Sequence, residues 1–152
     1  MNEVSKQEES SLRWQVRILT LAGAIPFLLA LCLVVFPQEG LDGAAVATSY
    51  AALIIAFLSG TLWMQVFKAA GSSLLPLLLK SNVVTLVAWG AWLFGSQRTV
   101  LALHGACFLY LLFLDHRLWK AGHLPQWYYS VRRGVTLIVV TSLLLVIGAL
   151  SV

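Results

Sequence analysis

Five long runs of apolar residues follow one another along the chain, separated by short polar or glycine-containing segments. A run of about 20 apolar residues is long enough to cross the ~30 Å hydrocarbon core of a bilayer as a helix. None of the runs alternates apolar and polar residues with a period of two, as the strands of a membrane barrel do. The pattern therefore predicts an all-α bundle of five transmembrane helices, with spans at residues 18–36, 44–67, 74–94, 99–114 and 135–152.

The composition leaves little room for anything besides this membrane domain. Only 11% of the residues are charged and 60% are hydrophobic, with a mean hydropathy of +0.88, whereas a soluble domain is about one quarter charged. We therefore expect residues 1–16 to form a cytoplasmic tail and residues 17–152 to form a single transmembrane domain. Nucleic acid binding requires a basic patch on a folded surface. The sequence predicts no such patch, so we expect no nucleic-acid partner.

The basic residues are distributed unequally between the two sides of the predicted bundle. When the N-terminus is placed in the cytoplasm, eight of the ten lysines and arginines fall in cytoplasmic segments. These residues are Lys6, Arg13, Arg17, Lys68, Arg117, Lys120, Arg132 and Arg133. Because cytoplasmic segments carry an excess of Lys and Arg, the N-terminus is predicted to be cytoplasmic and the C-terminus to lie outside.

The second and third spans offer candidate residues for a small intramembrane pocket. A stripe of small residues runs along the second span from Ala45 to Ser59 and continues to Trp63 and Phe67. Such a stripe lets another helix approach closely, so it should face the inside of the bundle as a packing seam or as a pocket wall. In the third span, we expect Asn82 to bond to another helix, on the same sector as Trp89. The candidate pocket residues are Ser59, Trp63, Asn82 and Trp89.

Lys80 stands early in the third span, where a charge is unusual. One interpretation is that its long side chain reaches the interface while its methylene groups stay in the apolar region. The other is that Lys80 is a buried cation that faces a substrate or an acidic partner, since ionisable residues inside membranes are commonly functional. The sequence leaves both interpretations open.

The connection at residues 115–134 is the longest and the most polar of the chain. Asp115 is its only acidic residue. We expect Asp115 to pair with Arg132 or Arg133 at the mouth of the fifth span, and so to clamp the connection against the bundle.

Three further residues of this connection belong to the same candidate site. Trp127 and Tyr128 are typical of the membrane–water interface, and Pro125 should help to turn the chain back into the bilayer. Two interpretations remain: a plain interfacial aromatic belt with solvated charges, or a charge-clamped segment with a binding role.

The sequence gives no positive sign of catalysis. It contains no phosphate-binding glycine loop, no metalloprotease helix motif and no motif for a nucleophile with its base. If the protein were an enzyme, Asp115 and His116 would be the acid/base candidates. A metal site formed by Asp115, His116 and His123 would lack any recognised ligand spacing. We expect no catalytic residue, no metal and no cofactor.

Three stretches together carry a family resemblance. The first is the Gly-Ala-Ile-Pro-Phe segment at 23–27, and the second runs from a tyrosine to a tryptophan over residues 50–63. The third consists of Asp115, Gly122, Pro125, Trp127, Tyr128, Arg132 and Thr136. These stretches resemble a family of small bacterial integral membrane proteins of unknown function, which is related to eukaryotic transmembrane protein sixty-nine.

The resemblance implies a five-helix bundle in the bacterial inner membrane and supplies no activity. The chain departs from the family's pattern at Leu62 and Met64, where a histidine and a glycine are common. No polar role is therefore carried over to these two positions.

Three functional hypotheses follow from the sequence. The first is a non-enzymatic accessory or scaffold protein of a larger membrane complex. The second is a protein that binds or transports a lipid or small amphiphile, using the region of Trp63 and Trp89 with the Asp115–Arg132 segment. The third is a membrane enzyme. The expected partners are membrane lipids, and in addition a membrane protein or a second copy of the chain.

Overall fold

The computed structural model describes residues 3–68 and 75–150, which fold into six helices. The helices are α1 (Glu3–Ala22), α2 (Ile25–Val35), α3 (Gly43–Lys68), α4 (Leu75–Phe94), α5 (Gln97–Lys120) and α6 (Gln126–Ala149). The first two helices contribute to one span, so the described residues contain five segments long and apolar enough to cross a membrane. The prediction of five membrane-length helical spans is confirmed. The predicted limits at residues 74 and 152 lie outside the described residues.

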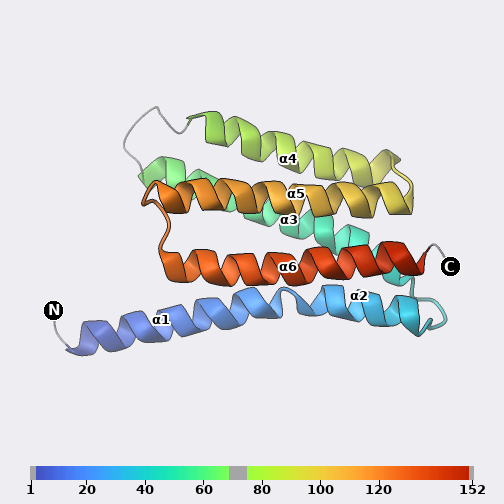
Figure 1. The fold of residues 1–152 in the computed structure, drawn as a ribbon, viewed down its shortest axis with the longest axis horizontal. Coiled ribbons are helices and arrows are strands. Elements are labelled where there is room, and N and C mark those ends of the chain that lie inside the picture. Colours follow the sequence, from blue (N-terminus) through green and yellow to red (C-terminus); the bar gives the residue numbers. More distant parts are fainter. Residues whose placement is uncertain (1–2, 69–74, 151–152) are drawn as a thin grey trace.

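The helices α3 and α5 form the centre of the bundle (Figure 1). The helix α3 packs against α2, α4 and α5, and α5 packs against α3, α4 and α6. The helix α4 covers one side of this centre, and α6 with the α1–α2 span covers the other. The span formed by α5 is the most buried of the five. The helix α1 begins at one end of the bundle and α6 ends at the other, as an odd number of crossings requires.

The first span is broken at Gly23 and Ala24, between α1 and α2. Pro26 stands in the first turn of α2, where its missing N–H removes no helical hydrogen bond. The hydroxyl of Tyr50 on α3 donates to the carbonyl of Gly23 at 3.3 Å. The span predicted at 18–36 therefore consists of two helical pieces, and the segment predicted as a tail is helical from Glu3 onward.

The prediction of a long polar connection at residues 115–134 is wrong. The helix α5 continues to Lys120 and α6 begins at Gln126, so only residues 121–125 connect them. Gly122 takes a positive φ of 78°, and its N–H and the next one bond back to carbonyls in the last turn of α5, as in a glycine-ended helix cap. Hydropathy marks the end of the hydrocarbon layer, but Lys, Arg and Gln continue a helix readily, which is why the polar residues here are helical.

The helix α3 buries a different face from the predicted one. Ala45 on the predicted stripe is exposed, whereas Ala44 and Ala47 are fully buried. At about 100° per residue, the two faces differ by about 90°. A Cβ on Gly43 would lie 2.5 Å from the carbonyl oxygen of Ala30 on α2. This close approach of α2 sets the buried face at the start of α3.

Candidate functional site

A buried ion pair joins α5 and α6. The Nε–H of Arg132 donates to Oδ2 of Asp115 at 3.1 Å, and the two side chains are only 5% and 9% exposed. A buried charge is costly unless it is paired and hydrogen-bonded, and this geometry meets that requirement. Of the two arginines proposed as partners from the sequence, Arg132 makes the bond, while Arg133 is exposed on another side of α6.

The position of the pair follows from the short turn between the two helices. Because only residues 121–125 separate α5 from α6, the end of α5 and the beginning of α6 lie side by side (Figure 1). Thr136 stands one turn beyond Arg132 on α6, and its hydroxyl oxygen accepts a second guanidinium hydrogen bond at 3.4 Å. The guanidinium is therefore held by one group on each helix.

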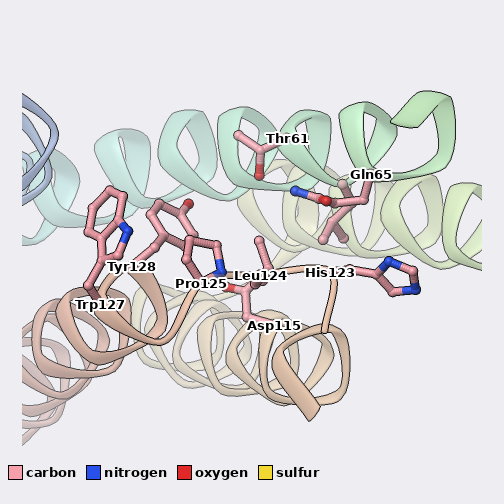
Figure 2. A pocket seen from close by; sticks show the side chains of 9 residues that line it. Thr61, Gln65, Asp115, His123, Leu124, Pro125, Trp127 and Tyr128 are labelled. Atoms are coloured by element: carbon pink, nitrogen blue, oxygen red, sulfur yellow. The ribbon is translucent and has the colours of Figure 1, made fainter. Parts of the chain in front are cut away.

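On one side of the ion pair lies a cavity of about 200 Å³, which we call the polar vestibule. Its lining includes Thr61, Gln65, Asp115, Leu124, Pro125, Trp127 and Tyr128. Figure 2 shows Thr61 and Gln65 projecting from α3 toward Asp115 and Tyr128 on the opposite wall. The vestibule thus combines an amide, two hydroxyls and a carboxylate, which can hold a polar group by hydrogen bonds.

On the other side of the ion pair lies a larger cavity of about 410 Å³, which we call the apolar groove. Residues from α1, α2, α3, α5 and α6 line it. They include Thr20, Phe27, Ile54, Phe108, Arg132 and Val139. The volume lies within the range of roughly 300–1,000 Å³ that is typical of small-molecule sites, whose walls are mostly apolar with a few polar groups.

Tyr128 and the ion pair form the boundary between these two cavities. Tyr128 lines both of them, whereas Asp115 lines the vestibule and Arg132 lines the groove. The two bonded side chains therefore line different cavities, Asp115 the polar one and Arg132 the apolar one. A cationic side chain therefore lies at the edge of an apolar space inside the helical bundle.

Aromatic rings from three helices meet in the wall of the apolar groove. Phe27 of α2 contacts Tyr50 of α3 and Phe108 of α5 edge to face, with ring centroids 5.1 and 5.8 Å apart. Tyr50 also bonds to the carbonyl of Gly23, which lines the same groove. Gly23, Phe27 and Tyr50 belong to the stretches that carry the family resemblance, but the sequence predicts no site role for them. The structure brings them to the cavity that contains Arg132.

The four residues expected to line a pocket are placed differently. Trp63 donates its indole N–H to the hydroxyl of Ser81 on α4 at 3.0 Å, so it ties α3 to α4. Asn82 is exposed and donates to a carbonyl of its own helix, not to another helix as expected. Trp89 is exposed, and the buried Ser59 hydroxyl has no hydrogen-bond partner among the described residues. None of the four lines any of the cavities described above.

The structure supports both interpretations of the aromatic residues, because Trp127 and Tyr129 lie in different surroundings. Trp127 lines the vestibule, and the centroid of its ring lies 5.9 Å from the guanidinium carbon of Arg13 on α1. Tyr129 instead stacks on Trp119 with centroids 5.0 Å apart. The end of α5 and the beginning of α6 therefore carry both a stacked aromatic pair, as is typical of a membrane–water interface, and a tryptophan that lines the polar vestibule.

The acid/base candidates do not face one another. His116 has its Nδ1 3.1 Å from the hydroxyl of Tyr129 and lines a different cavity from Asp115. Figure 2 shows the ring of His123 turned away from Asp115 at the edge of the vestibule. Within residues 3–68 and 75–150, no three His, Cys, Asp or Glu side chains come together as metal ligands.

The chain belongs to the family described as Protein of unknown function (DUF3429), whose family model matches residues 12–148. A comparison with curated proteins and one with solved structures gave no match. The resemblance to a family of unknown function is thus supported, while the relation to transmembrane protein sixty-nine stays a prediction. The matched region includes Asp115, Arg132 and the residues of both cavities. Because the family supplies no activity, function has to be argued from the site.

Proposed function

We propose that this protein binds a single-chain anionic amphiphile, such as a fatty acid anion, within the membrane. The observation that carries the proposal is the position of Arg132, which lines an apolar groove of about 410 Å³ and bonds through its guanidinium to Thr136 in the same wall. An acyl chain matches the apolar wall, and an anionic headgroup matches a guanidinium, which forms strong charge-assisted hydrogen bonds with carboxylate and phosphate oxygens.

The headgroup would lie where the groove meets the polar vestibule. A guanidinium has five N–H donors, and Arg132 gives one to Asp115 and one to Thr136. Donors therefore remain for a ligand oxygen while the ion pair stays in place. The tail would extend along the groove past Phe108 and Val139, where burying apolar surface is favourable.

The geometry of the site changes the order of the functional hypotheses. The sequence alone favoured an accessory or scaffold role, but the two adjoining cavities support a binding role instead. Asp115 is bonded to Arg132, and His116 lies against Tyr129, so these two residues are not arranged as an acid/base pair for catalysis. We therefore place amphiphile binding first among the three hypotheses.

The proposal includes a place in the cell. The basic residues and the family resemblance favour the bacterial inner membrane, with the N-terminus in the cytoplasm and the C-terminus outside. Compartment-sensitive reporters fused to each terminus test this orientation. We expect them to report opposite compartments, with the N-terminal one inside; any other result would overturn the orientation.

Native mass spectrometry of the purified protein tests the binding role. The wild-type protein, released gently from the membrane, should carry one acyl-chain amphiphile. Ile54→Trp would fill the groove from α3 and should release the ligand, whereas Leu53→Trp, at a neighbouring position that is exposed and does not line the groove, should retain it.

A second variant tests the headgroup site. Asp115→Leu with Arg132→Leu removes both charges together, so no unpaired charge is left in the bundle. We expect this double variant to fold and to lose the anionic ligand. Equal ligand content in the wild-type protein, Ile54→Trp and the double variant would refute the proposed function.

A further inference from the structure

A furrow runs between α4 and α5. It shares no lining residue with the apolar groove, and it meets the polar vestibule only at His123. It consists of two adjoining cavities, of about 400 and 190 Å³, that share Lys80. The larger one lies toward the middle of the bundle and the smaller one toward the end that holds the turn between α5 and α6. Lys80 therefore marks the point where one section of the furrow passes into the other.

The smaller section is basic. Its lining includes Lys80, Arg117 and His123. The helix α4 has no acidic residue, and the only acidic residue of α5, Asp115, is bonded to Arg132. Within the described residues, Lys80 and Arg117 thus have no carboxylate partner. A basic pocket between transmembrane helices near the membrane surface attracts anionic lipid headgroups.

The larger section is apolar and borders the lipid. Leu79, Val83 and Val87 line it from α4 and are 69%, 48% and 44% exposed. Leu103 and Ala106 line it from α5. Such a surface suits acyl chains that lie along the protein and continue into the bilayer. The furrow therefore has a basic section for a phosphate and an apolar section for the chains of the same molecule.

We infer that the α4–α5 furrow is a binding site for an anionic glycerophospholipid, with its phosphate at Lys80 and Arg117 and its acyl chain along Val83 and Val87. The inference favours the interpretation of Lys80 as a functional cation, because its half-buried side chain lines both cavities. This site is independent of the amphiphile proposed beside Arg132.

The test uses the full-length protein in lipid nanodiscs. Phosphatidylglycerol mixed into phosphatidylcholine should raise the thermal unfolding midpoint of the wild-type protein above its value in phosphatidylcholine alone. Lys80→Gln with Arg117→Gln should abolish this increase, with about a fivefold loss of phosphatidylglycerol affinity for each charge removed. The double variant should still retain the amphiphile of the apolar groove, so failure at one site is distinguishable from failure at the other.

A matched control separates a built site from general attraction. Lys120→Gln with Arg133→Gln removes two exposed charges from the same end of the bundle and should leave the effect of phosphatidylglycerol unchanged. An equal loss in both double variants, or no effect on the wild-type protein, would overturn the inference.

A second pair of variants leaves all charges in place. Ala106→Trp blocks the apolar section of the furrow and should remove the phosphatidylglycerol effect, whereas Ala102→Trp, also exposed on α5 but not lining the furrow, should keep it. Glycerol phosphate added to nanodiscs of phosphatidylcholine alone should have no effect. If it stabilised the protein as phosphatidylglycerol does, the site would recognise a free phosphate, and the lipid inference would be wrong.

Discussion

Asp115 and Arg132 are bonded across the boundary between two cavities of different chemistry. Asp115 lines the polar vestibule and Arg132 lines the apolar groove, with Nε and Oδ2 3.1 Å apart. The pair links α5 to α6 and at the same time places a cation at the edge of an apolar space. The same two side chains therefore have a structural role and a proposed functional role, and substitutions can separate the two roles.

Removing one partner of the pair should cost more stability than removing both. Asp115→Leu leaves Arg132 as an unpaired buried charge, so we expect a loss of about 3–5 kcal/mol. Asp115→Leu combined with Arg132→Leu should recover most of this loss, because apolar residues replace the buried pair. Unfolding by a denaturing detergent, followed by circular dichroism, measures both effects.

Arg133→Leu serves as the control for this prediction, since Arg133 is adjacent in sequence but exposed. It should change the stability far less than Asp115→Leu does. If the double variant were as unstable as the sum of its single substitutions, the ion pair would not act as a unit.

Tyr50 should stabilise the break between α1 and α2. Its hydroxyl bonds to the carbonyl of Gly23 at 3.3 Å, and a hydrogen bond of this kind contributes about 0.5–1 kcal/mol. Tyr50→Phe keeps the ring contact with Phe27 and should lower the free energy of unfolding by this amount. Tyr110→Phe, on the exposed side of α5, should have no such effect. Equal stability of Tyr50→Phe and the wild-type protein would show that the bond does not matter.

Two buried serines should respond differently to substitution by alanine. Ser81 accepts the indole N–H of Trp63 at 3.0 Å, so Ser81→Ala should destabilise the contact of α3 with α4 by about 1 kcal/mol. The hydroxyl of Ser59 is buried and has no hydrogen-bond partner in the part of the chain that the structure describes, so Ser59→Ala should leave stability unchanged or raise it. Thermal unfolding in detergent compares them, and a larger loss for Ser59→Ala would contradict the assigned contacts.

The spans and the ion pair could be predicted because each depends on a simple constraint. Lipid requires long apolar helices, so hydropathy locates them without knowledge of packing. Asp115 is the only acidic residue near the two arginines, so a pairing was expected. The choice between Arg132 and Arg133 depends on the rotation of α6, and the sequence did not reveal that α6 begins as early as Gln126.

The cavities could not be predicted in the same way. The apolar groove depends on the break at Gly23 and on the contact of Phe27 with Phe108, which are relations between distant parts of the chain. The expected pocket around Trp63 and Trp89 assumed that small residues mark the buried face of α3. The close approach of α2 at Gly43 sets that face instead.

Photo-cross-linking with a diazirine-bearing fatty acid tests the central claim most directly, because it locates the acyl chain in the protein. After illumination in nanodiscs, mass spectrometry of the peptides should find adducts at buried residues of the apolar groove such as Phe108 and Val139, and Ile54→Trp should remove them. Adducts confined to exposed positions such as Leu53 and Leu144, unchanged by Ile54→Trp, would show that the groove does not hold the amphiphile.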